Sequence, residues 1–292
     1  MEYSKHFVCF LDILGFKNLI ANSTSLNEIG EIGHLLGYFK YFHEKFNNAD
    51  ANDILRFTTK EKTTKIELNL KLKTSFFSDS IILSFEVVEF RQDLMQLYYI
   101  INQIAELAFE VTLYCGRFMR GGLTYGDLYH ENDVCFGPAL IEAVQLEKDA
   151  VYPRISVAPK VIDYTSGDFP LKHLNIEQDR RMKRTFAYIQ REILSTDLTG
   201  QIPIHYIDFL WRYLPESEAI ANRLKDVILT QLNKDYDDYI MRKYVWFANC
   251  YNFLLGSYTQ HKIAPIDINS SLLDDYKYQN QGCEEPNYLL PQ

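Results

Sequence analysis

The chain has 292 residues, of which 47% are hydrophobic and 24% charged, as in a globular protein with one large domain or a domain with an appendage. A net charge of −9 argues against binding a nucleic acid polymer through its backbone, because that interaction needs a basic face. No signal peptide is evident and no apolar stretch reaches membrane-spanning length, so we expect a cytoplasmic protein that has no membrane partner.

The first part of the chain alternates predicted strands and helices. Residues 6–20, HFVCFLDILGFKNLI, are typical of a buried strand leading into a helix, and 25–46 has helical spacing of apolar residues. A lysine- and threonine-rich connection follows. Residues 66–87 alternate in period two on both sides of FFSDS, which predicts two strands joined by a tight turn. A long apolar helix is predicted over 91–115.

The middle of the chain completes the predicted sheet. Residues 117–137 indicate a pair of strands broken by glycines and a polar turn, in which His130 is expected to be solvated. A helix over 138–150, a strand over 152–159 and a late strand over 203–210 follow. The order predicts an α/β (α+β) fold, a ferredoxin-like mixed sheet covered by helices.

Three parts are predicted along the chain. Residues 1–212 form the sheet domain, 213–262 a helical C-terminal extension, and 263–292 a polar tail that is extended or mobile. Within the extension, 217–232 and 238–256 have helical patterns. The aromatic residues of the second helix fall at helical spacing, which favours core or dimer packing over base stacking.

Asp12 lies in the middle of an apolar run, where an unpaired charge is costly. One interpretation is a helix N-cap, because Asp commonly opens a helix after a strand. The other is a metal ligand at the carboxyl end of a strand, next to Gly15, where backbone amides can meet a phosphate. Asp12 alone supports the cap at least as well as the metal.

Asp79 lies at the tip between two apolar strands, and a turn residue with a local hydrogen bond is its simplest interpretation. In a ferredoxin-like sheet, however, the first strand lies beside the hairpin strand, so Asp12 and Asp79 share one edge. Two carboxylates there repel each other unless a divalent cation lies between them. Oxygen ligands suit Mg²⁺ or Mn²⁺, with a nucleoside triphosphate as the remaining ligand. The pair therefore predicts phosphoryl chemistry with two metal ions per site.

Four motifs, in this order, resemble those of class III nucleotidyl cyclases. FLDILGF (10–16) is similar to the first-strand motif, and SDSIIL (78–83) lies where the family carries its second metal aspartate. RGGLTYG (120–126) and FGPALIEAVQLEKDA (136–150) are similar to the later strand and helix motifs. The set spans residues 7–157, roughly half of the chain.

The resemblance implies that Asp12 and Asp79 bind the two metals and that the Ile13 carbonyl is an added ligand. Gly15 has no Cβ, so its backbone can approach a phosphate closely. The resemblance places the phosphate-binding amides around three residues, Leu14, Gly15 and Phe16.

Four positions depart from the adenylate cyclase pattern. Ser75 stands where those enzymes have a lysine, and Val134 stands where they have a base-reading aspartate. Ile141 and Gln145 replace the Asn and Arg that stabilise the transition state. The purine-reading pair is therefore missing, and we assign Ser75, Val134 and Gln145 to substrate binding in a different pocket.

The basic group for the developing phosphate charge has three candidates, Arg117, Arg120 and Lys73. We choose Arg120 as the catalytic arginine because arginine commonly binds phosphate. A surface arginine beside a glycine bulge explains it equally well.

A cyclase that keeps both metal aspartates but loses the purine readers resembles the pyrimidine cyclases of bacterial Pycsar anti-phage defence. The resemblance implies a homodimer with sites at the subunit interface, which converts UTP, favoured over CTP, to the 3′,5′-cyclic monophosphate and pyrophosphate. A separate cyclic-nucleotide effector protein would receive the product. The alternatives are an adenylate or guanylate cyclase with an unusual base pocket and a non-catalytic nucleotide-binding regulatory module.

Overall fold

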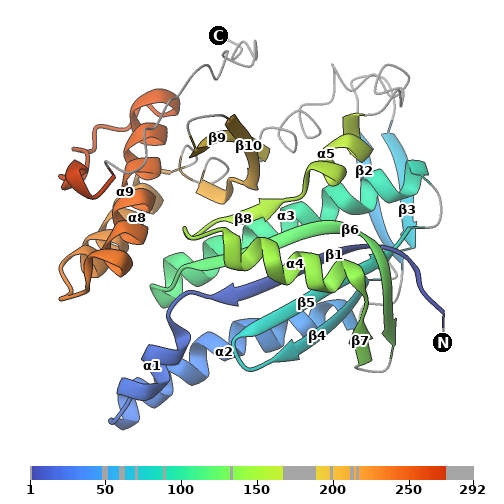
Figure 1. Ribbon diagram of the computed structural model, residues 1–292, viewed down its shortest axis with the longest axis horizontal. Coiled ribbons are helices and arrows are strands. Elements are labelled where there is room, and N and C mark those ends of the chain that lie inside the picture. The colour runs from blue at the N-terminus through green and yellow to red at the C-terminus, as the bar shows by residue number, and fades with distance from the viewer. Residues whose placement is uncertain are drawn as a thin grey trace.

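A central mixed sheet organises the computed structural model, which describes residues 2–47, 52–58, 63–69, 72–87, 90–131, 134–166, 189–197, 200–210, 214 and 217–273. The strands of this sheet are β1 (Ser4–Ile13), β4 (Leu72–Phe77), β5 (Ser80–Glu86), β6 (Met119–Glu131), β7 (Val134–Phe136), β8 (Ile155–Val157), β9 (Ile189–Asp197) and β10 (Gly200–Ile207). They are ordered β4-β5-β1-β6-β8-β10-β9, and β7 pairs with the end of β6 (Figure 1). The path β4-β5-β1-β6 is the ferredoxin-like order, so the predicted fold class is confirmed.

β1 lies in the middle of the sheet and is antiparallel to both of its neighbours. In this register Asp12 is opposite Ser80 of β5 on one side and opposite Arg120 of β6 on the other. β6 is parallel to β8, and β8 pairs with β10, so the late strand predicted over 203–210 joins the sheet as expected. One end of β1 is thus placed beside two neighbouring strands that both carry polar side chains.

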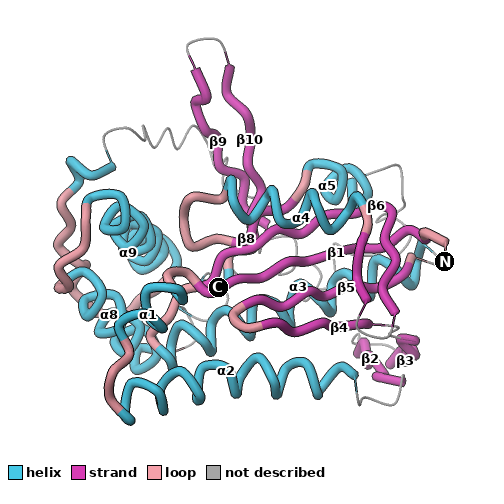
Figure 2. Tube along the Cα trace, turned by 60° about the horizontal axis from the view of Figure 1, so that its bottom comes forward, coloured by secondary structure: helices cyan, strands magenta, loops and turns pink. Residues whose placement is uncertain are grey.

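Helices cover both faces of the sheet and one of its ends. Their bounds are α1 (Phe16–Asn22), α2 (Leu26–Asn47), α3 (Phe90–Cys115), α4 (Pro138–Asp149), α5 (Pro159–Ser166), α8 (Glu218–Leu232), α9 (Asp238–Tyr258) and the short 3₁₀ helix η4 (Ser270–Leu273). α2 and α3 pack on one face and α4 packs on the other, while α8 and α9 lie near the end of the sheet where β1 leads into α1 (Figures 1 and 2).

The prediction of an irregular connection before residue 66 was wrong. Residues of β2 (Asn52–Thr58) and β3 (Thr63–Asn69) form a separate two-stranded antiparallel sheet. β3 ends at Asn69, and β4 begins at Leu72 as a different strand. The period-two alternation continues through this point, so the sequence pattern does not mark where the chain changes its strand partner.

The predicted break at the glycines of 117–137 was also wrong, because β6 is one continuous strand of 13 residues. Gly122 shows why glycine is needed inside it. A Cβ on Gly122 would lie 2.3 Å from the Ala143 carbonyl oxygen and 2.5 Å from the Leu146 Cβ, both on α4. The missing side chain therefore lets α4 lie directly on β6.

The two C-terminal helices form as predicted, and both have side-chain N-caps. Ser217 accepts a hydrogen bond from the Ile220 amide, and Asp237 accepts one from the Ile240 amide. Of the predicted tail, 263–273 is described, while 274–292 lies outside the described residues. The division at 212 and 262 stays a prediction.

Helix α9 supplies much of the aromatic packing at its end of the sheet. Four of its aromatic side chains belong to the same hydrophobic core as the central strands, which confirms their predicted packing role: Tyr244, Trp246, Phe247 and Tyr251. Among the helices in the described ranges, none is both long and apolar enough to cross a bilayer.

Candidate active site

Asp12 is the penultimate residue of β1, and its side chain is 16% exposed. It does not cap a helix, because α1 begins at Phe16 and its N-cap is Gly15, which has a left-handed φ of 78°. The N-cap interpretation of Asp12 is therefore wrong. The Ser80 hydroxyl donates to Asp12 Oδ1 at 3.3 Å, which fixes one side of the carboxylate.

Asp79 occupies the turn between β4 and β5, next to Ser80. Its negative charge raises the pKa of both Asp12 and Glu147, so these three carboxylates gather at one edge of the sheet. The structure thus brings together the two aspartates that the predicted topology paired. Their assignment to metals stays a prediction.

Arg120 lies between two of these carboxylates. Its Nη2 is 3.3 Å from Asp12 Oδ2, and its Nε pairs with Glu147 Oε1. The side chain is 24% exposed, so Arg120 bridges acidic groups inside the site and is not a free surface arginine. In this arrangement the guanidinium is positioned before any ligand binds.

Glu147 was not among the predicted site residues, although the sequence carried a signal for it. It follows Ala139 and Ala143 at intervals of four on α4, and all three face the sheet as the buried residues of that helix. A carboxylate in line with two buried alanines indicates a partner inside the protein, because an unpaired buried charge is costly. That partner is Arg120.

The carboxylates outnumber the cation that bridges them. Burial is the largest effect on Asp12 and, together with the charges of Glu147 and Asp79, raises its pKa to about 6, against a smaller lowering by Arg120. Burial likewise raises the pKa of Glu147. The edge therefore holds an excess of negative charge that a further cation would neutralise.

The donor set at this edge fits Mg²⁺ or Mn²⁺, which prefer oxygen ligands. Within the described residues, no three His, Cys, Asp or Glu side chains form a ready-made metal cluster. Asp12 and Asp79 would therefore supply two carboxylates, and backbone and substrate oxygens would complete the shell. Magnesium sites built around substrate phosphates have this composition.

The residues that were predicted to bind a metal or a phosphate through their backbone lie in different environments. The Leu14 amide donates to the Phe118 carbonyl at 2.8 Å, so in this structure it is engaged in the sheet and does not face a phosphate. The Ile13 side chain is buried, and only its backbone can reach the site. The roles of Ile13, Gly15 and Phe16 stay predictions.

The predicted base-side residues do not join this edge within one chain. Val134 pairs with Glu131 at the far end of β6, about 35 Å along the strand from Arg120. Ile141 is 73% exposed on α4, and Gln145 donates to Asp149 Oδ1 at 2.8 Å on the exposed face of the same helix. Val134 thus lies far along β6 from the Asp12 edge, whereas Ile141 and Gln145 form an exposed surface of α4 on a different face from Glu147.

Ser75 belongs to a buried polar cluster centred on His130. The Ser75 hydroxyl is 2.8 Å from His130 Nε2, and the Ser84 hydroxyl is 2.7 Å from Nδ1. His130 is 3% exposed, so the prediction of a solvated turn residue was wrong. The reason is that β6 continues to Glu131, which places His130 over β4 and β5 instead of in a loop.

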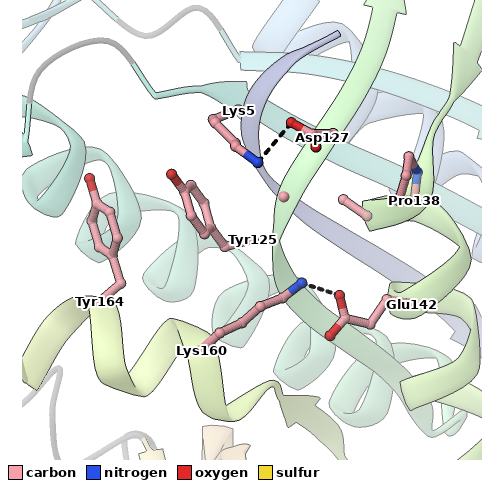
Figure 3. Close-up of a pocket in the computed structure, with 9 residues that line it drawn as sticks. Lys5, Tyr125, Asp127, Pro138, Glu142, Lys160 and Tyr164 are labelled. Carbon is pink, nitrogen blue, oxygen red and sulfur yellow. Dashed lines mark hydrogen bonds and ion pairs between the residues drawn. The ribbon is translucent and has the colours of Figure 1, made fainter.

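A cavity of about 450 Å³ lies elsewhere, between β6, α4 and α5 (Figure 3). Lys5 pairs with Asp127 at 2.8 Å and Lys160 pairs with Glu142, so its charged side chains balance. Among the β6 residues that line the cavity, Tyr125 is the nearest to Arg120, about 17 Å away along the strand. The cavity is separate from the carboxylate edge.

No protein-family profile matches the chain, and no curated protein matches it. Three solved structures are similar in fold. The adenylyl cyclase CyaB from P. aeruginosa is 12% identical over 70% of this chain and 94% of its own, with a TM-score of 0.42. A rhodopsin-guanylyl cyclase core with converted specificity, in complex with ATPalphaS, is 12% identical over 71% and 96%, also at 0.42. An adenylate/guanylate cyclase/hydrolase from Silicibacter pomeroyi is 13% identical over 71% and 98%, at 0.38.

Proposed function

We propose that this protein is a nucleotide cyclase that converts a nucleoside triphosphate to its 3′,5′-cyclic monophosphate and pyrophosphate. The observation that carries the proposal is the edge where Asp12, near the end of β1, meets Asp79, in the β4–β5 turn, with an excess of negative charge. The ordered motifs that resemble class III cyclases support the same activity. Asp12 is costly to bury in its charged form next to a second aspartate, so this edge is expected to bind a cation.

The reaction breaks the bond from the α-phosphorus to the bridging oxygen and forms a bond from the ribose 3′ oxygen to the α-phosphorus. The 3′ hydroxyl loses its proton, and the electron pair leaves with pyrophosphate. Divalent cations at Asp12 and Asp79 would lower the pKa of that hydroxyl and neutralise the leaving group. Arg120, held by Asp12 and Glu147, would present a fixed guanidinium to the charge that develops on the phosphate.

Ser75 and Val134 would bind the base of a pyrimidine nucleotide, with UTP favoured over CTP. In support, neither residue carries the charge of the purine-reading pair that it replaces. Ser75 is held by His130, so a base in that pocket would meet a hydroxyl of fixed orientation. A cyclic pyrimidine nucleotide would serve as a messenger in anti-phage defence and would be received by a separate effector protein.

A homodimer would bring the Asp12 edge and the predicted base-side residues of different protomers together. In a twofold assembly, the Asp12 edge of one protomer can face the Ser75 and Val134 surface of its partner. Exposed apolar side chains among the base-side residues support an interface, with Ile141 at 73% and Val134 at 49% exposure. A complementation test follows. Asp79→Asn and Ser75→Arg should each be inactive alone, and an equimolar mixture should regain about a quarter of wild-type activity, since half the dimers would carry one intact site.

The activity is tested by incubating the purified protein with Mn²⁺ and ATP, GTP, CTP or UTP in turn, and identifying products by mass and chromatography. A cyclic pyrimidine supports the full proposal, and a cyclic purine keeps the reaction but replaces the base assignment. Asp79→Asn should abolish product, whereas Asp235→Asn, which removes an exposed carboxylate from the α8–α9 loop, should not.

A non-catalytic nucleotide-binding module is the second candidate. One observation favours it: Arg120 already pairs with Asp12, as a built-in cation would in a protein that no longer binds metal. Binding of a nucleotide without release of pyrophosphate, in Mg²⁺ and in Mn²⁺, would establish this alternative.

A further inference from the structure

The C-terminal helix α9 packs directly against the start of β6, next to the candidate active site. The Phe118 ring contacts Phe247 at 4.4 Å and Tyr244 at 5.4 Å between ring centroids. Phe118 comes two residues before Arg120, and its carbonyl accepts the hydrogen bond from the Leu14 amide. α9 is therefore fixed to the point where the carboxyl end of β1 meets the first residues of β6.

Lys243 is the residue of α9 that immediately precedes this contact, and it is buried with 7% exposure. Its Nζ lies 4.3 Å from the centroid of the Tyr239 ring. Across the described parts of the chain, its ammonium makes neither an ion pair nor a hydrogen bond. A lysine whose side chain is largely buried and whose ammonium has no counter-ion would be stabilised by an anionic ligand.

The charges that act on Lys243 come from the same site. Burial lowers the pKa of its amine most, the Arg120 charge lowers it further, and Asp237 and Glu147 act in the opposite direction. Arg120 is already neutralised by Asp12 and Glu147, whereas Lys243 is not neutralised by any direct contact. The carboxylates of this edge need cations, so the ligand that fits Lys243 is a phosphate group that binds together with divalent cations.

We propose that Lys243 binds the phosphate oxygens of the triphosphate substrate and of the pyrophosphate product, as a cation supplied to the site by the C-terminal extension. This inference rests on the proposed function and deepens it. A lysine ammonium is a compact point charge that suits phosphate oxygens. The bond to the leaving pyrophosphate would strengthen as charge moves onto it during the reaction.

The test is calorimetric titration of inorganic pyrophosphate, in Mg²⁺, into the full-length wild-type protein and three variants. Lys243→Met should bind about 10- to 100-fold more weakly, the range expected for a lost charge-assisted hydrogen bond. Lys243→Arg, which keeps the charge but is larger, should lose less affinity than Lys243→Met. The matched control is Lys262→Met, which removes an exposed lysine of the same C-terminal region and should bind like the wild type.

Thermal unfolding of the same variants separates ligand binding from a structural role. Lys243→Met removes a buried charge without a direct counter-ion, so it should unfold at the same or a higher temperature than the wild type. Wild-type affinity in Lys243→Met overturns the proposal, as does a wild type that does not bind pyrophosphate. A wild type that binds pyrophosphate in a Lys243-dependent way but cyclises no nucleotide would refute the proposed activity and leave this inference standing.

Discussion

Asp12→Asn should make the protein more stable at neutral pH while abolishing its activity. The folded environment raises the pKa of Asp12 from an ordinary 3.8 to about 6, so ionised Asp12 opposes folding. A difference of about two units corresponds to about 3 kcal/mol of unfolding free energy. The variant leaves Arg120 paired with Glu147 and keeps a hydrogen-bond acceptor for Ser80.

The pH dependence has a definite sign. Protonated Asp12 does not oppose folding. The unfolding free energy of the wild type is therefore undiminished by Asp12 below about pH 4, and it falls as the pH rises through about 6. The gain from Asp12→Asn should therefore be about 3 kcal/mol at pH 7.5 and about half of that at pH 5. Urea denaturation in the presence of a chelator measures both values.

Two results would refute this reasoning. One is a variant less stable than the wild type at pH 7.5, which would mean that the Arg120 pair outweighs burial and the neighbouring carboxylates. The other is a stability difference that does not change between pH 5 and pH 7.5. Asp235→Asn, an exposed loop carboxylate, serves as the control and should change stability at neither pH.

Three further predictions concern the metal site and the strands of the central sheet. Added Mg²⁺ or Mn²⁺ should raise the melting temperature of the wild type but not of Asp79→Asn, and an equal rise in both would disprove the metal assignment. Gly122→Ala should lower the unfolding free energy by about 3 kcal/mol, measured in urea, because its Cβ would overlap the Ala143 carbonyl; an unchanged midpoint would contradict that packing. His130→Ala should cost about 2–4 kcal/mol, because it empties a buried position and removes the partner of two serine hydroxyls; a loss below about 1 kcal/mol would show that the cluster is not stabilising.

The sequence was sufficient to predict that Asp12 and Asp79 meet, because strand order and turn position are encoded in period-two patterns and local turn residues. It was not sufficient to predict that a glycine in β6 allows α4 to pack closely against the strand. Gly122 looks like a strand breaker locally, and only its distance to α4 shows that it permits close packing. Glu147 was missed for a similar reason, since its partner Arg120 lies on another element.

Lys243 shows a further limit of sequence patterns. A lysine within an aromatic helix is expected to extend towards solvent along its aliphatic stem. Lys243 is nevertheless buried, on a helix that packs against Phe118, a contact between segments more than a hundred residues apart. Periodicity along α9 carries no information about that contact. Long-range packing of this kind therefore has to be read from the structure.

The contact between Phe118 and α9 also bears on when the protein first acquires its proposed activity. A ribosome delivers the carboxylates of β1 and the β4–β5 turn before the helix that packs beside them, because α9 comes much later in the chain. Until α9 folds back onto Phe118, the nascent chain has the acidic edge without its C-terminal cover. Chains cut short before residue 238 lack Lys243, and we expect them to bind pyrophosphate more weakly than the 292-residue chain.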